Sequence, residues 1–294
     1  MFSKRVQRTI SRPCTVSGRG YWSGKLNSLT FLPAPSDHGV RFVRQDLPYA
    51  TPVHAKATLS QGMPLRTRLT DGHSDFDMIE HVMSALYGLG IHNVLVQCTS
   101  AEMPGFDGSS FPIALALQGA GIQDQESYVQ DCPLTEVIEV SNDDRFVRYE
   151  PQTEGNQLSL EYQLDYGESS PIGIATFACE LSSEFYLEQI APARTFVTRE
   201  EADQLQANGI AQHVTERDLL VFGPDGPIGN ELRFADECAR HKALDLLGDL
   251  ALTGVNLVGR LIARRSGHQM NGELARLIQE KMDEAANANI RVAS

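Results

Sequence analysis

The chain has few cysteines, no long apolar run and no basic run. The five cysteines are an odd number at irregular spacing without a CxxC pair, which excludes a disulfide framework and predicts a reducing compartment. No window approaches about 18 consecutive apolar residues, so a membrane span is excluded. Residues 1–16 lack the apolar core of a secretory signal. We therefore expect a cytoplasmic protein without a transmembrane segment.

The charge balance argues against a nucleic-acid-binding protein. Lys and Arg number 25 against 38 Asp and Glu, a net charge of −13. Since a nucleic-acid-binding surface needs clustered positive charge, we expect no nucleic-acid partner.

What is present is an ordinary globular pattern of strands and helices, 41% hydrophobic over 294 residues. The pattern predicts an α+β protein, and a polar stretch near 125–132 divides it into domains 1–128 and 129–294. The first domain has predicted strands at 29–35, 39–48 and 92–98 and helices at 77–88 and 113–121. The second has predicted strands at 135–142, 145–151, 158–166, 172–180 and 257–265, helices at 198–208, 235–252 and 272–286, and a loop at 266–272.

The stretch ARHKALDLLGDL, residues 239–250, is the most informative. It places His241, Asp245 and Asp249 four residues apart, along one face of a helix. An imidazole one turn from a carboxylate is a suitable ligand pair for zinc or another divalent metal. A third ligand has to come from elsewhere in the chain.

An internal similarity indicates where. Residues 80–97 and 240–263 share a histidine near a helix start, a glycine-containing break and an apolar strand. Two similar halves packed face to face would bring His81 towards His241. Together with Asp245 they would form a two-histidine, one-carboxylate site with a position open to water.

Neighbouring residues suggest acid–base roles. Glu80 could act as general base, and His268, in a glycine-flanked segment, as an acid or charge-stabilising group oriented by Asp249. Each also has an ordinary interpretation, because isolated histidines and helical glutamates are more often structural. Cys238 could be a fourth ligand, although a small buried hydrophobe is favoured. Five histidines lack partners at metal spacing and are expected at the surface: His38, His54, His73, His92 and His213.

Several segments in collinear order resemble the UDP-3-O-acyl-N-acetylglucosamine deacetylase family, the zinc amidases of lipid A biosynthesis. The likeness runs from about residue 8 to 285. It rests on GRGYWSG (18–24), LPAPSDHGVRFVRQDL (32–47), IEHVMSALYGLGIHNVLVQ (79–97), EMPGFDGSSFP (102–112), ARTF (193–196), GNELRFADECARHKALDLLGDL (229–250) and SGHQMN (266–271).

The resemblance implies a fold, a site and a reaction. The fold is two similar βααβ-type layered domains packed face to face with an interdomain active site. The reaction is hydrolysis of the 2-acetamido group of an acylated nucleotide sugar, releasing acetate, by a monomer. The implied site residues are His81, His241 and Asp245 on zinc, Glu80 as base, His268 with Asp249 as acid or charge stabiliser, Thr195 at the oxyanion, and Lys242, Phe196, Asp165 and Tyr166 at the substrate.

The departures from the family pattern lie in substrate-binding segments. Trp22 stands where the family usually has histidine, and residues 165–171 and 209–218 differ from the usual motifs. Two alternatives therefore stay open: a divergent relative that deacetylates a different N-acetylated sugar, and a non-catalytic metal-binding relative. Iron(II) is an alternative to zinc, because the ligand set accommodates both.

Overall fold

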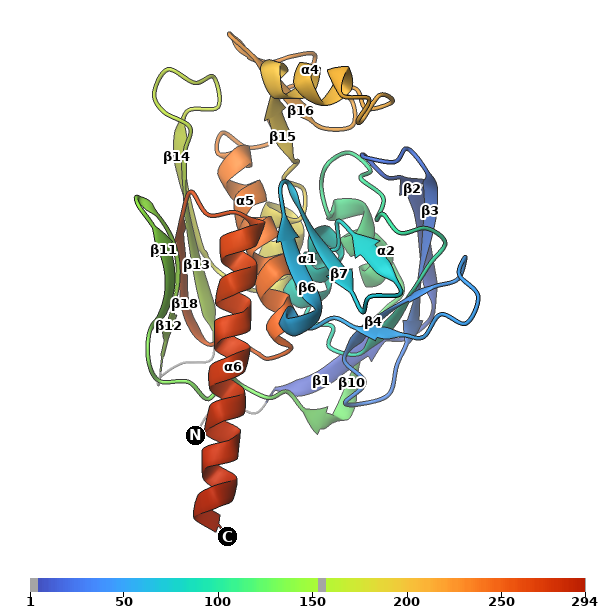
Figure 1. The fold of residues 1–294 in the computed structure, drawn as a ribbon, viewed down its shortest axis with the longest axis vertical. Helices are drawn as coiled ribbons and strands as arrows, with labels where there is room; N and C mark the ends of the chain where they lie inside the picture. The colour runs from blue at the N-terminus through green and yellow to red at the C-terminus, as the bar shows by residue number, and fades with distance from the viewer. Residues whose placement is uncertain (1–4, 153–156, 294) are drawn as a thin grey trace.

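The computed structural model describes residues 5–152 and 157–293, with side chains of the last helix as far as residue 285. Two five-stranded sheets form the outer layers, and most of the helices lie between them (Figure 1). The first sheet contains β2 (Cys14–Arg19), β3 (Leu26–Pro33), β9 (Val94–Cys98), β4 (Val40–Arg44) and β5 (Val53–His54) in that spatial order. The second contains β11 (Ile138–Asn142), β12 (Arg145–Pro151), β18 (Gly259–Arg264), β13 (Leu158–Asp165) and β14 (Ile174–Glu180).

The two sheets have one topology. Numbered along the chain within each sheet, the strands run 1-2-5-3-4 across both, and in both the third and fifth strands are parallel. A helix precedes the fifth strand in each half and another follows it: α1 (Glu80–Gly88) and α2 (Phe111–Gly119), then α5 (Glu237–Leu250) and α6 (His268–Ala293). The duplication suggested by residues 80–97 and 240–263 is therefore confirmed, and His81 and His241 lie on corresponding helices.

Each half carries an excursion between its fourth strand and its first long helix. In the first half this is the sheet of β6 (Ser60–Met63), β7 (Arg66–Thr70) and β8 (Asp75–Asp77). In the second half, after a short helical stretch at 183–190, it contains β15 (Phe196–Thr198), α4 (Arg199–Ala207), β16 (Leu220–Gly223) and β17 (Gly226–Pro227). A two-stranded ribbon of β1 (Val6–Ile10) and β10 (Ile122–Tyr128) completes the first half.

The alternation of buried and partly exposed residues shows which side of each sheet faces the core. Along β13 buried residues alternate with partly exposed ones, so Leu160 and Tyr162 face inward, as a strand with one solvated face requires. Helices α1 and α5 pack closely on each other. A Cβ on Gly248 would lie 2.1 Å from the backbone oxygen of Glu80, so glycine is required for this approach. The close contact brings the two candidate metal-binding helices together.

Two predicted boundaries were wrong. The helix expected from 77 begins at Glu80, because residues 75–77 pair with β7 and Met78 adopts a positive φ of 62°. The loop expected at 266–272 is largely helix, since α6 begins at His268. Its first turn packs against β6, where a Cβ on Gly62 would lie 2.4 Å from the backbone oxygen of His268. Gly62 therefore permits close packing between β6 and the start of α6.

The described part of the chain contains no helix that is both long and apolar enough to cross a membrane. Helix α4 begins as the sequence predicts, with Thr198 and Glu201 forming a reciprocal capping box.

The expectation of surface positions was wrong for three of the five histidines: His38, His54 and His92 are partly buried, whereas His73 and His213 are exposed. Of the three, His92 makes a hydrogen bond between distant segments of the chain. Its Nδ1 accepts a hydrogen bond from the backbone N–H of Arg8 at 3.0 Å. Burial lowers the pKa of His92 from 6.5 to about 4, and the nearby Arg8 and Arg5 contribute. The folded protein therefore holds this ring neutral at pH values where the unfolded chain binds a proton.

We predict a stability loss in acid from this histidine. Because the folded pKa lies below the unfolded one, the contribution is complete above pH 6.5 and is lost as the pH falls towards 4. For this partly exposed ring the expected loss is about 2 kcal/mol. Unfolding midpoints of the wild type and His92→Asn between pH 7 and 4 test this, with the exposed His73→Asn as control. Parallel pH profiles for wild type and His92→Asn would refute it.

Candidate active site

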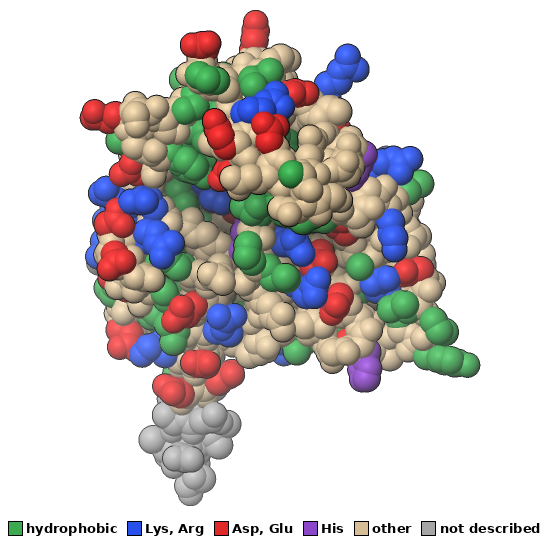
Figure 2. Space-filling model, turned by 45° about the horizontal axis from the view of Figure 1, so that its top comes forward, with side chains coloured by type: hydrophobic (Ala, Val, Ile, Leu, Met, Phe, Trp, Pro, Cys, Tyr) green, Lys and Arg blue, Asp and Glu red, His purple; other side chains and the backbone are tan. Residues whose placement is uncertain are grey.

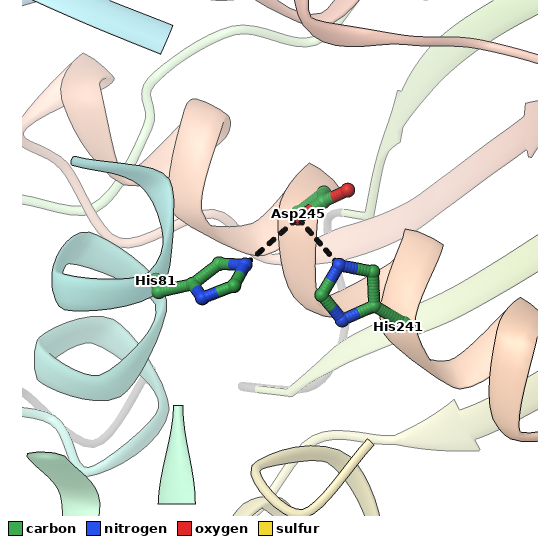
Figure 3. A group of neighbouring side chains, drawn as sticks. All are labelled: His81, His241 and Asp245. Carbon is green, nitrogen blue, oxygen red and sulfur yellow. Dashed lines mark ion pairs between the residues drawn. The ribbon is translucent and has the colours of Figure 1, made fainter. Parts of the chain in front are cut away.

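Three buried side chains from α1 and α5 converge between the two halves. His81 on α1 and His241 on α5 both direct Nε2 towards Asp245, one turn further along α5 (Figure 3). The distances to Asp245 Oδ1 are 3.7 Å from His81 and 3.4 Å from His241. The structure thus brings together the three residues that the sequence selected, and one ligand atom from each lies within 4.8 Å of the others.

The spacing of these atoms fits a metal ion. A tetrahedral zinc with bonds of about 2.0–2.1 Å holds its ligand atoms about 3.4 Å apart. His241 Nδ1 lies 3.1 Å from the carbonyl oxygen of Ala193, an outer contact that fixes the ring and directs Nε2 to the shared point. Among the described residues Cys238 is not part of this group, and burial raises the pKa of its thiol to about 12. The interpretation of Cys238 as a small buried hydrophobe is consistent with this position.

Asp245 also pairs with Lys242, whose Nζ donates to Oδ2 at 2.7 Å. Burial alone would raise the pKa of Asp245, but the charges of Lys242 and His241 hold it well below its usual value. Burial alone would lower the pKa of Lys242, but the negative charge of the Asp245 carboxylate raises it above its usual value. The site therefore keeps an ionised carboxylate, which is the form that ligates metals.

Glu80 is 3% exposed and lies beside the group, at the first turn of α1. Burial raises the pKa of its carboxyl group, an effect that His268 and His81 partly offset. Its Oε2 accepts a hydrogen bond from the backbone N–H of Thr67 at 2.9 Å. A fixed carboxylate with a raised pKa is suited to accepting a proton near neutral pH.

His268 and Asp249 form a second buried pair. His268 Nδ1 lies 2.9 Å from Asp249 Oδ2, and its Nε2 lies 3.9 Å from Asp245 Oδ2. Burial acts to lower the pKa of His268, but Asp249 raises it to about 9. The imidazole is thus held in its charged form, facing the candidate metal position.

Two residues of this network were missed by sequence reasoning. Thr67 donates through Oγ1 to Asp249 at 2.6 Å and through its backbone N–H to Glu80, and Asn271 Nδ2 donates to Asp249 at 2.9 Å. Asn271 lies in the SGHQMN segment, three residues after His268, which is a usable signal. No spacing indicates Thr67, because it is 182 residues from Asp249.

Four of the other predicted residues line an adjacent pocket. Thr195, Phe196, Lys242 and Tyr166 line it, together with Glu80, His268 and the three candidate ligands. Phe196 packs edge-on against both His241 and Tyr166, with ring centroids 6.3 and 5.7 Å apart. Asp165 is not among the lining residues, since its carboxylate accepts from Arg264 and from the backbone of Gly167.

The rest of the pocket lining is apolar. It comes from the loops of the first half and from the excursion containing α4. The apolar residues besides Phe196 are Tyr21, Trp22, Leu65, Met78, Val197, Leu205, Ala211, Val214 and Leu219. In the space-filling view hydrophobic side chains border a hollow beneath this excursion (Figure 2). A larger cavity of about 800 Å³ lies around Tyr87 and His92, but the described residues lining it include none of the candidate ligands.

A metal position formed by two histidines and a carboxylate, with a buried glutamate and a charged histidine beside it, defines a metal-dependent hydrolase site. The family model of UDP-3-O-acyl N-acetylglycosamine deacetylase matches residues 7–280. The chain belongs to this family, and is thus a deacetylase, an amide hydrolase. The resemblance inferred from the sequence is confirmed.

Individual relatives are similar in sequence to this protein along nearly the whole chain. Proteins named UDP-3-O-acyl-N-acetylglucosamine deacetylase from Anaeromyxobacter dehalogenans and Stenotrophomonas maltophilia are each 34% identical to it, covering 97% and 92% of the chain and 91% and 89% of their own lengths. The protein of that name from Ruthia magnifica is 33% identical over 94% of the chain and 91% of its own length.

Proposed function

We propose that this protein removes the acetyl group from the 2-acetamido nitrogen of UDP-3-O-acyl-N-acetylglucosamine in lipid A biosynthesis. Water is consumed, the amide C–N bond breaks, and acetate and the free amine are released. The observation that carries the proposal is the convergence of His81, His241 and Asp245 beside Glu80 and His268, in a chain similar throughout to deacetylases of that name.

His81, His241 and Asp245 would hold zinc, with iron(II) as an alternative for the same donor set. When bound, such an ion lowers the pKa of water and polarises a carbonyl oxygen. Glu80 would accept the proton of the attacking water, since Thr67 fixes its carboxylate at the edge of the pocket. The raised pKa of Glu80 makes it a stronger base than an exposed glutamate.

The remaining polar residues would stabilise charge and deliver a proton. His268 is positively charged below about pH 9, so it could stabilise the charge developing on the carbonyl oxygen and then protonate the leaving amine. The Thr195 hydroxyl group would donate a hydrogen bond to the same oxygen. Asp249 would act through His268, by keeping its ring oriented and charged.

Substrate binding would use the pocket walls. The apolar lining beneath α4 suits the 3-O-acyl chain, because burying methylenes there removes them from water. Lys242, Phe196 and Tyr166 would contact the sugar and nucleotide near the metal. Asp165, whose carboxylate accepts a hydrogen bond from Arg264, would contact the substrate beyond the residues that line the pocket.

The test is acetate release by the purified protein from UDP-3-O-acyl-N-acetylglucosamine. We expect turnover that a chelator abolishes and that added zinc or iron(II) restores. A metal-loaded protein that releases no acetate from this substrate would refute the proposal. Release from an N-acetylated sugar without the nucleotide in the same assay would favour the divergent relative suggested by the changes at Trp22, 165–171 and 209–218.

A further inference from the structure

We propose that Trp22 sets the length of the acyl chain that the enzyme accepts, by forming a fixed wall of the apolar pocket. The inference rests on the proposed function, in which this pocket receives the 3-O-acyl group. Trp22 is the only tryptophan in the chain, and it lines the same pocket as the metal group and the apolar residues of the α4 excursion.

The backbone beside Trp22 is held rigidly. Glu102 accepts hydrogen bonds from the backbone N–H of Trp22 at 2.6 Å and of Ser23 at 2.7 Å. Gly20 lies against the same carboxylate, where a Cβ would come within 2.4 Å of Glu102 Oε2. Bonds from two successive backbone donors to one carboxylate fix this loop on the first half of the molecule.

The indole ring is braced as well. The guanidinium group of Arg66 stacks over it, 4.5 Å from the ring centroid, and Arg66 Nε lies 3.7 Å from Asp77 Oδ1. A cation stacked on an indole is attracted by the negative face of the ring, and more strongly where the pair is desolvated. Rotation of the ring out of the pocket would break this contact, so the indole is expected to keep its place when ligand binds.

A second part of the pocket wall is attached to the same loop. His213 Nε2 lies 2.9 Å from the carbonyl oxygen of Gly20, and the Tyr21 hydroxyl group donates to the carbonyl oxygen of Asp218. The segment 209–218, which contributes Ala211 and Val214 to the pocket, is therefore tied to the residues flanking Trp22. Both parts of the wall are held by these contacts, so we expect the pocket to resist widening around a longer chain.

The volume of the pocket makes this restraint important. It measures about 120 Å³, against about 300–1,000 Å³ for common ligand pockets. A pocket of that size fills with few methylenes, and the bulk of the indole then decides whether a longer chain fits. Discrimination by one methylene in an apolar pocket ranges from about 10- to 200-fold.

The experiment compares two substrates whose 3-O-acyl chains differ by about four carbons. Burial of about four additional methylenes is large enough to change binding measurably. We measure kcat and KM for acetate release by the wild type, Trp22→Ala and Trp22→Phe, with the fully exposed Tyr49→Ala as control. In Trp22→Ala the ratio of kcat/KM for the longer to the shorter substrate should rise at least about tenfold, mainly through KM for the longer one. The rise should be smaller in Trp22→Phe and absent in Tyr49→Ala.

An equal loss on both substrates in Trp22→Ala, or an unchanged ratio, would overturn the proposal. A second measurement does not depend on turnover. Because Trp22 is the only tryptophan, its fluorescence reports on this wall directly, and a saturated fatty acid should shift the emission of the wild-type protein to shorter wavelength. Emission unaffected by saturated fatty acids of both lengths would also overturn it, whereas absence of acetate release alone would count against the proposed function.

Discussion

Replacement of Glu80 by glutamine is expected to lower kcat by about 10²–10⁴-fold, the usual contribution of a general base. The amide keeps the size of the side chain and can still accept the hydrogen bond from Thr67, but it cannot take a proton from water. Because His81, His241 and Asp245 are unchanged, metal content should be unchanged. Steady-state acetate release and metal analysis of the same preparation test both parts.

The matched control for this change is Glu273→Gln on α6, an exposed glutamate given the same substitution. Its kcat should equal that of the wild type. If Glu80→Gln retained wild-type kcat with full metal content, Glu80 would not be the base.

Replacement of Glu237 by alanine is expected to reduce the free energy of unfolding by about 3–5 kcal/mol, as when one partner of a buried ion pair is removed. Glu237 is fully buried at the start of α5. Its carboxylate accepts from Arg194 Nε at 2.8 Å and from the backbone N–H groups of Arg194 and Arg233. The variant would leave the Arg194 guanidinium buried without this carboxylate.

The same change should also reach the active site, because Arg194 directly precedes Thr195. We therefore expect reduced acetate release at temperatures where the variant is still folded. Denaturant unfolding of Glu237→Ala tests the stability effect, with Glu139→Ala as control. Glu139 pairs with Arg148 where both side chains are about one-third exposed, so the control should change by less than about 1 kcal/mol. Equal losses of stability in the two variants would contradict the stabilising role of the buried Glu237–Arg194 pair.

The sequence predicted much of the arrangement because the relevant signals are local. The spacing of His241 and Asp245 puts them on one helical face whatever the helix packs against. The residue pattern of 158–166 predicted a strand, and the similarity of 80–97 to 240–263 predicted two halves with corresponding histidines. That similarity was enough to select His81 as the third ligand before any contact was known.

Contacts between distant segments were not predictable in this way. Thr67 joins Glu80 to Asp249, although no sequence pattern distinguishes its position. Ala193 lies in the ARTF segment, but that segment does not predict that its carbonyl group orients His241. The role of Gly62 was not predictable from the sequence either. It allows β6 to pack on the first turn of α6, which is a helix where a loop was expected.

The sequence by itself determined which side chains could bind a metal and on which helical faces they lie, because helix and strand periodicity follow from backbone geometry. Only the tertiary structure decided that α1 and α5 approach closely enough at Gly248 to bring His81 to Asp245. It also decided that Trp22 borders the same pocket as the metal group. These outcomes depend on how separate elements pack, and packing is set by shape and burial across the whole core rather than by local spacing.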